Sequence, residues 1–351
     1  MRKTESKVAA GAQGRFAEVD TLKGAGILLV IFGHLLEHPV SETPLVHDLH
    51  TAIYSFHMPL FVFLSGIFAK EVLSRTDYRK IIWSLFVPLV VFQIVYMGVG
   101  QWADWGTYPP FAPYWLLWFI ASLIVWRLVL PLVASPIGLC VAILGAVLAG
   151  FDHSVGYALS ASRTLYFLPF FILGHLYGKP LIAAAGRNRP TFILIFVAAM
   201  AIVVFWRWNG LDPAALTGSH DYDGAPPAPI FPGVARLVVM TLGLAGLIGF
   251  SALIPARSRA LEWLGQRSLA IYLLHGLVVM VFVASGGMSL IPAAAQIPAM
   301  AALAVLIAVL TAAGDLPMRR FFRPPDEAPQ RKRAAAYGPP DRGQMSRSHR
   351  L

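Results

Sequence analysis

The sequence predicts an all-α, polytopic membrane protein with about ten transmembrane helices and both termini in the cytoplasm. Of its 351 residues, 57% are hydrophobic and only 13% are charged, and the mean hydropathy is +0.65. A soluble domain of this composition would have too little polar surface to cover itself. Apolar stretches of about 20 residues, the length that crosses a bilayer, recur along the chain, and they lack the alternation of a membrane β-strand.

Each apolar stretch is expected to form one span, and the fifth is the shortest. The expected spans are residues 20–36, 50–69, 81–99, 114–133, 137–150, 162–179, 191–208, 233–254, 268–284 and 291–313. Together they define a transmembrane domain over residues 20–313. Residues 1–19 form a polar cytoplasmic tail with no sign of a cleavable signal peptide. Residues 314–351 are basic and poor in apolar residues, so we expect a disordered cytoplasmic tail. If this tail binds anything, anionic lipid is the expected partner.

The orientation follows from the charges, because cytoplasmic loops retain Lys and Arg. Positive residues collect in the tails and in alternate loops: Arg2, Lys3, Lys7, Arg15, Lys70, Arg75, Arg79, Lys80, Lys179, Arg187, Arg189, Arg257, Arg259 and Arg267. The remaining loops hold Glu37, Glu42, Asp48, Asp104, Asp152, Asp212, Asp221 and Asp223, with Arg163 and Arg207 as their few positive members. The net charge of +10 is therefore a topology signal, and nucleic acid is not an expected partner.

Two ionisable residues of the first span predict a functional groove. Lys23 and His34 are eleven positions apart, which is three helical turns plus about 20°, so both lie on one face about 16 Å apart. Lys23 is expected near the cytoplasmic mouth and His34 near the opposite side. Gly24, Gly26 and Gly33 should let neighbouring helices approach closely. The alternative is a snorkelling lysine and a helix-end histidine in headgroup water.

Three further histidines are expected inside the membrane. His57, entering from the outside on the second span, should reach a depth similar to that of His34. His175 and His275 lie in the sixth and ninth spans, where packing or hydrogen bonding would also explain them. No pair has the spacing of a helical metal site and no carboxylate lies among them, so we expect no metal. Cys140 is the single cysteine. A buried histidine without metal is suited to proton transfer.

Several segments resemble the acyltransferase 3 family of integral membrane acyltransferases. The opening segment, residues 15–34, reads RFAEVDTLKGAGILLVIFGH and is similar to the family's first block, with its Asp, Leu, basic residue and His at Asp20, Leu22, Lys23 and His34. Four later segments also resemble the family: FHMPLFVFLSGIF, YWLLWFIASLIVWRL, FLPFFILGHLYG and SLAIYLLHG. The second and third of these resemble the fucose O-acetylase-like branch. The resemblance covers about residues 15–285.

The resemblance implies transfer of an acyl group, usually acetyl from cytoplasmic acetyl-CoA, to a hydroxyl of a surface carbohydrate in the bacterial inner membrane. His34 would then be the catalytic base, with His57 orienting it or sharing the proton. Basic residues at the cytoplasmic mouth are assigned to acyl-CoA: Lys23, Arg79 and Lys80. Residues assigned to the acceptor are Arg163, His175 and His275. The chain departs from the family in having Lys23 where many members have Arg, and only adjacent Arg79 and Lys80 before Pro88.

Two other functions stay open at this stage. A proton-coupled transporter of a glycan or small anion could use the same groove, and a scaffold without chemistry would explain the spans but not Lys23 and His34 on one face. The outer loop, roughly residues 208–232, is rich in Gly, Pro and Asp and either covers a site or serves as a linker. The acceptor, the acyl group and a homo-oligomeric state are not fixed by the sequence.

Overall fold

The computed structural model describes residues 2–106, 108–109, 111–151, 158–219 and 232–323. Every regular element in these ranges is helical. The α-helices are α1 (Arg2–Leu36), α2 (Pro44–Gly66), α3 (Arg75–Ile81), α4 (Val87–Trp102), α5 (Trp118–Val133), α6 (Pro136–Leu148), α7 (Ala161–Arg187), α8 (Arg189–Trp208), α9 (Pro232–Leu253), α10 (Arg259–Gly265), α11 (Ser268–Ala284), α12 (Gln296–Ala312) and α13 (Asp315–Phe321). A π-helix, Ile82–Phe86, joins α3 to α4.

The prediction of an all-α polytopic membrane protein is confirmed, and helices occupy all ten expected stretches. Within the described part of the chain, seven helices are long and apolar enough to cross a membrane, and the pair α10 and α11, bent by 77°, would make an eighth. The remaining two stretches are α6, which is shorter, and α2, whose histidines and Asp48 dilute its apolar character.

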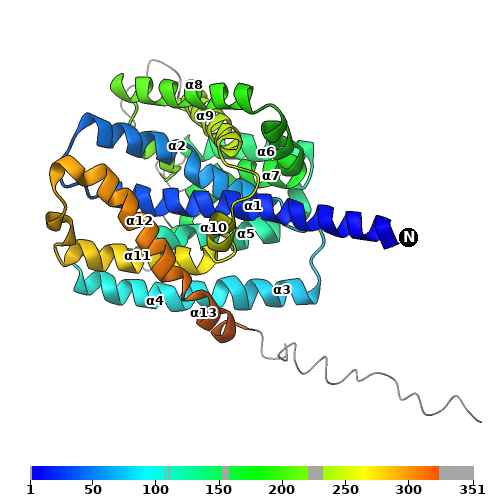
Figure 1. The fold of residues 1–351 in the computed structure, drawn as a ribbon, viewed down its shortest axis with the longest axis horizontal. Coiled ribbons are helices and arrows are strands. Elements are labelled where there is room, and N and C mark those ends of the chain that lie inside the picture. Colours follow the sequence, from blue (N-terminus) through cyan, green and yellow to red (C-terminus); the bar gives the residue numbers. More distant parts are fainter. Residues whose placement is uncertain (1, 107, 110, 152–157, 220–231, 324–351) are drawn as a thin grey trace, which may run out of the picture.

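Helices α1 and α2 form the centre of the bundle. Helix α1 packs against α2, α10, α11 and α12, while α2 packs against α7, α8 and α9. The α1–α2 and α11–α12 connections lie at one end of the bundle, left in Figure 1, and the α2–α3 connection lies at the other end. The expected close approach at α1 is confirmed, because a Cβ on Gly24 would overlap the carbonyl oxygen of Leu261 and one on Gly265 would overlap that of Asp20.

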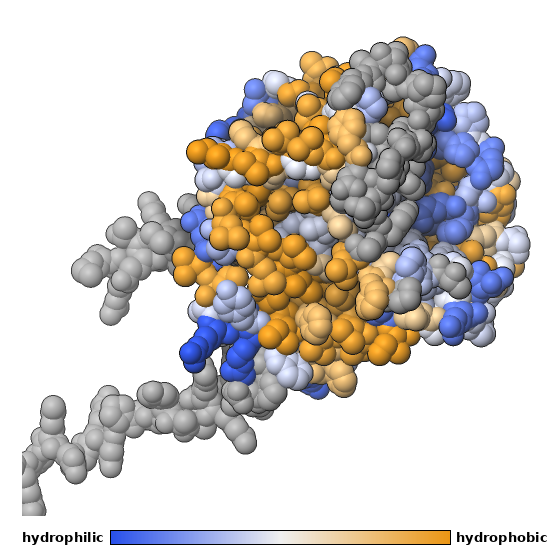
Figure 2. Space-filling model, turned by 180° about the vertical axis from the view of Figure 1, so that it is seen from behind, coloured by the Kyte–Doolittle hydropathy of each residue, from blue (hydrophilic) through white to orange (hydrophobic). Residues whose placement is uncertain are grey.

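A broad apolar face surrounds the bundle, as expected for a membrane protein. Figure 2 shows hydrophobic residues over the middle of the visible face and hydrophilic residues gathered toward its two ends. Large apolar side chains exposed around the bundle include Ile94, Phe205 and Leu306. In water such an area would favour aggregation, whereas lipid chains cover it without cost.

Two segments differ from the sequence prediction. The tail expected from residue 314 does not start as disordered chain, because Asp315–Phe321 forms α13, which packs against α11. The outer loop begins with a helical turn, Pro213–Thr217, packed against α2. Residues 220–231 of that loop and residues 324–351 of the tail lie outside the described residues, as do Asp152, Asp221 and Asp223.

Candidate active site

The C-terminal end of α1 borders a cavity of about 170 Å³. We call it the His34 cavity. Its wall combines polar and aromatic side chains of six segments: His34, Glu37, Tyr54, His57, Met58, Trp115, Leu116, Trp118, Arg163, Phe167, Leu216, Thr217 and Tyr272. The predicted site residues His34, His57 and Arg163 are therefore brought together. Leu216 and Thr217 come from the start of the outer loop, which contributes to the cavity wall.

His34 is paired with a carboxylate one helical turn away. Its Nδ1 lies 3.2 Å from Oε1 of Glu37, and its side chain is only 12% exposed. Tyr54 of α2 donates its hydroxyl to the same oxygen and lies 3.3 Å from Nδ1 of His34. Because a carboxylate only accepts, Nδ1 of His34 carries the proton and Nε2 is left as the basic nitrogen. A carboxylate that orients an imidazole in this tautomer is the arrangement of a general base.

Glu37 stays ionised in this setting. Burial opposes its charge, but the His34 imidazole and the hydrogen bonds with His34 and Tyr54 outweigh it and lower the pKa of Glu37 to about 2. A fixed negative charge beside the ring stabilises the imidazolium that forms when His34 accepts a proton. From the sequence, Glu37 was expected only as a loop charge and no carboxylate was expected among the histidines, and the structure corrects that expectation. The signal was present in the i, i+3 spacing of His34 and Glu37.

Aromatic rings fix the plane of the His34 imidazole. The ring centroids of Trp115 and His34 are 4.7 Å apart. The ring of His275, on α11, stacks on that of His34 with 5.6 Å between centroids. Trp115 has a positive φ of 40°, a region that non-glycine residues rarely adopt. Such strain often marks functional positions, where the surrounding packing holds it. The sequence analysis did not single out Trp115 or Tyr54.

The backbone fixes the tautomers of His57 and His275. Nδ1 of His57 lies 2.8 Å from the carbonyl oxygen of Ile53, and Nδ1 of His275 lies 3.0 Å from the carbonyl oxygen of Ile271. Because a carbonyl cannot donate, each Nδ1 donates, and Nε2 is the acceptor nitrogen of the neutral ring. Nε2 of His275 is buried and has no hydrogen-bond partner among the described residues. His57 faces Tyr54 with 4.7 Å between ring centroids.

Arg163 supplies the positive charge of the His34 cavity. Its guanidinium stacks on Trp118 at 5.1 Å from the ring centroid. The start of α7, which carries Arg163, is tied to α5 through Thr164: Ser122 Oγ lies 2.7 Å from Thr164 Oγ1 and Trp126 donates to the Thr164 carbonyl at 2.8 Å. A cation held in this way can stabilise negative charge that develops on a bound substrate.

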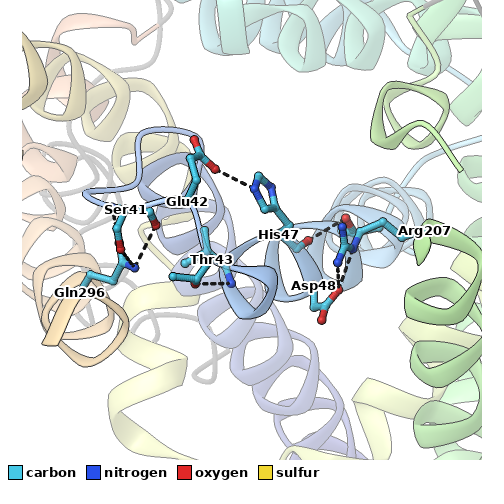
Figure 3. Close-up of polar contacts among 9 residues, drawn as sticks. Ser41, Glu42, Thr43, His47, Asp48, Arg207 and Gln296 are labelled. Carbon is cyan, nitrogen blue, oxygen red and sulfur yellow. Dashed lines mark hydrogen bonds and ion pairs between the residues drawn. The ribbon is translucent and has the colours of Figure 1, made fainter. Parts of the chain in front are cut away.

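Polar contacts outside the cavity hold the start of α2, which carries Tyr54 and His57. Figure 3 shows Arg207 of α8 against Asp48 and Gln296 of α12 against Ser41. Arg207 Nε lies 2.6 Å from Asp48 Oδ1, and Gln296 both donates to the Ser41 carbonyl and accepts from its N–H at 3.1 Å. The helix itself is capped by Thr43. These contacts link α2 to α8 and α12 and so position its two site residues.

Lys23 lines a second cavity of about 430 Å³, which we call the Lys23 cavity. The rest of its wall comes from α1, the π-helix, α4, α10, α11 and α13 and from residues that directly follow α10 and α13: Asp20, Ser84, Pro88, Gly265, Gln266, Ser268, Leu269, Ala270, Asp315, Met318, Arg319, Phe322 and Arg323. No described residue lines both cavities, so the single groove expected along Lys23 and His34 is wrong: the two residues lie at separate cavities. Lys23 also lies over the ring of Phe68, 5.1 Å from its centroid.

Three predicted site residues lie elsewhere. His175 contacts Glu71 at 2.9 Å through Nε2, next to the α2–α3 connection, so it does not reach the His34 cavity as an acceptor-binding residue would. Arg79 and Lys80 are exposed on α3 and belong to neither cavity. The short α3 helix directs them away from the cavities, whereas the π-helix after it places Ser84 and Pro88 at the Lys23 cavity. Among the described residues no group of three His, Cys, Asp or Glu side chains could hold a metal ion.

The fold and the His34 cavity define an integral membrane protein with a histidine and carboxylate pair at the end of a buried helix. Residues 16–313 match the family model described as an acyltransferase domain, so the chain belongs to this acyltransferase 3 family. The resemblance seen in the sequence is confirmed, and the protein is a multi-pass membrane acyltransferase.

Two curated relatives carry the name nodulation protein NolL. The chain is 28% identical to that of Sinorhizobium fredii, over 77% of this chain and 79% of the relative. It is 25% identical to that of Mesorhizobium japonicum, over 77% and 78%. No solved structure matches the chain.

Proposed function

We propose that this protein is an O-acyltransferase of the bacterial inner membrane. It moves an acyl group, acetyl in the simplest case, from cytoplasmic acyl-CoA to a hydroxyl of a cell-surface or exported carbohydrate. The observation that carries the proposal is the contact of 3.2 Å between Nδ1 of His34 and Glu37 at the wall of the His34 cavity. This contact leaves Nε2 of His34 as a base for an acceptor hydroxyl.

The reaction assigns one task to each residue of the His34 cavity. Nε2 of His34 takes the hydroxyl proton while the acceptor oxygen forms its bond to the acyl carbon. Glu37 stabilises the resulting imidazolium, and Arg163 stabilises the negative charge on the carbonyl oxygen. The carbon–sulfur bond of the thioester then breaks, and His34 returns its proton to the departing sulfur. His57 accepts a hydrogen bond at Nε2 and orients the acceptor.

The Lys23 cavity is the proposed site of the acyl donor. Lys23 offers a positive charge to the phosphate groups of acyl-CoA, and the acyl thioester supplies both the acyl group and a thiol leaving group. Lys23 and His34 are eleven positions apart on α1, which is about 16 Å along the helix. The acyl end of the donor therefore has to pass between α1 and its neighbours to reach the acceptor.

A carbohydrate fits the wall of the His34 cavity. Trp115, Trp118 and Tyr272 provide aromatic surface, while Arg163, Glu37 and Thr217 provide hydrogen-bonding groups around it. Such a mixture suits a ligand that has hydroxyl groups on its edges and C–H groups on its faces.

Proton-coupled transport is the second candidate function, and one observation favours it. The 77° bend between α10 and α11 lies at the Lys23 cavity, through Gly265, Gln266 and Ser268, and broken helices are typical of transporter binding sites. Movement of a glycan across vesicles without consumption of acyl-CoA would support transport and contradict acyl transfer.

Membrane vesicles that contain the protein, labelled acetyl-CoA and envelope glycans test the proposal. We expect label on the glycans with the wild-type protein. The His34→Gln variant should lower the rate by about 10²- to 10⁴-fold, the range for loss of a general base. His175→Gln is the matched control, because this intramembrane histidine lies outside both cavities, and it should keep the wild-type rate. Undiminished transfer by a correctly inserted His34→Gln variant would contradict the mechanism.

A further inference from the structure

The Lys23 cavity has one wall that lies outside the family match. The match ends at residue 313, and α13 begins at Asp315. Five residues of this segment line the cavity: Asp315, Met318, Arg319, Phe322 and Arg323. A segment that follows the matched domain thus forms part of the proposed donor site.

Arg319 is held in place at this wall. Its Nε donates to Oδ1 of Asp315 at 2.8 Å, and its Nη2 donates to the carbonyl oxygen of Gln266 at 2.7 Å. A guanidinium has five N–H donors, so three of them are not used in these two bonds. An arginine fixed in this way loses little conformational entropy when it binds a phosphate.

The charges around the cavity leave a positive excess. Lys23, Arg319 and Arg323 line the cavity together with Asp20 and Asp315, so positive charges outnumber negative ones by one. Arg127 of α5 adds a further positive charge, because it lies close enough to Lys23 for the two to repel each other. Its buried Nε has no hydrogen-bond partner among the described residues. An anion in the cavity would relieve this imbalance.

The opposite wall is an irregular helix with apolar and polar groups. Pro88 has no N–H to bond the carbonyl of Ser84, and the chain between α3 and α4 forms the π-helix there. Both residues line the cavity, as does the ring of Phe322. Fixed cations beside an aromatic ring suit a ligand that combines phosphate groups with a planar base.

We propose that α13 is part of the donor site and that Arg319 binds a phosphate group of a nucleotide-bearing acyl thioester. This inference rests on the proposed function. The phosphate of an anionic lipid headgroup has the same chemistry and is the alternative source, so the experiment has an arm for each.

The first arm measures binding of labelled coenzyme A to the purified full-length protein in neutral detergent. Arg319→Gln should raise the Kd about tenfold, the effect expected from loss of one charge-assisted contact. The Kd of Arg319→Lys should lie between those of the wild type and Arg319→Gln, because lysine keeps the positive charge but lacks the paired N–H donors of the guanidinium. Arg320→Gln is the matched control: Arg320 is an exposed arginine on the same helix that does not line the cavity, and its Kd should equal that of the wild type.

The second arm measures phosphatidylglycerol retained by the same variants after purification. Equal Kd values for Arg319→Gln and Arg320→Gln would overturn the inference, and so would a loss of bound lipid confined to Arg319→Gln. If Arg319→Gln does not elute as a single folded species, Arg323→Gln takes its place with the same expectation. Failure of the proposed function has a different result, because the wild-type protein would then neither bind coenzyme A nor transfer acetyl groups.

Discussion

The His34 cavity and the Lys23 cavity border the same helix but differ in chemistry. The first is built from neutral rings around one carboxylate and one guanidinium, with His34 held at fixed distances from Glu37 and Tyr54. The second contains three cationic side chains: Lys23 of α1, Arg319 of the short helix α13, and Arg323 just after that helix. Rigid rings suit proton transfer, which needs atoms placed within tenths of an ångström, whereas long cationic side chains suit capture of an anion.

The contrast suggests a division of work between the two cavities. Changes in the His34 cavity should lower kcat, because they remove interactions made in the transition state. Changes in the Lys23 cavity should mainly raise the KM for the donor, because they remove interactions made on binding. A His34-cavity variant that changes only the KM, or a Lys23-cavity variant that changes only kcat, would contradict this division.

The largest effect after loss of His34 itself is expected at Glu37. Glu37→Gln keeps the size of the side chain but removes the charge that stabilises the imidazolium, so kcat should fall about 10²-fold while the KM for acetyl-CoA changes little. Initial rates in vesicles over a range of acetyl-CoA concentrations give both constants. An equal rise in KM would contradict the assignment of Glu37 to the chemical step.

The pH dependence sharpens the same prediction. The pKa of Glu37 lies at about 2, below its ordinary value of 4.5, so the carboxylate is charged throughout the neutral range and its contribution to stability is lost only as the pH falls toward 2. In infrared difference spectra, the carboxylate band that is absent from Glu37→Gln should therefore keep its ionised position from pH 8 down to about pH 4. A protonated carboxyl band of Glu37 in the neutral range would contradict a fixed negative charge beside His34.

An intermediate effect is expected at Lys23. Lys23→Gln removes a positive charge from the donor cavity, and the KM for acetyl-CoA should rise about tenfold, with a smaller change in kcat. Lys80→Gln is the matched control, because Lys80 is an exposed lysine of α3 outside both cavities. An equal KM for the two variants would remove Lys23 from the donor site.

The smallest effect is expected at Tyr54. Tyr54→Phe removes the hydroxyl that donates to Glu37 but keeps the ring that packs against His50 and His57. Loss of one such hydrogen bond is worth about 1 kcal/mol, so kcat should fall about fivefold. A loss as large as that of His34→Gln would assign Tyr54 a direct part in the chemistry.

The membrane class and the positions of the helices could be predicted from the sequence alone. These features depend on local properties: the length of an apolar run, the helical period and the chemistry of short motifs. The close approach of other helices to α1 could also be predicted from its glycines, because small residues in a span indicate close packing. The contact of Glu37 with His34 could have been predicted in the same way, because the two residues are one helical turn apart. Glu37 was instead counted among the loop charges.

Which distant residues come into contact could be learned only from the folded structure. His275 stacks on His34 from α11, whereas His175, similar to it in sequence context, contacts Glu71 near the other end of the bundle. The rotation and depth of each helix are set by packing with its neighbours, and hydropathy does not encode them. The same holds for α13, whose composition indicates a disordered tail. Its place at the Lys23 cavity depends on contacts of Arg319 with Asp315 and Gln266, and the second of these exists only once the chain has folded.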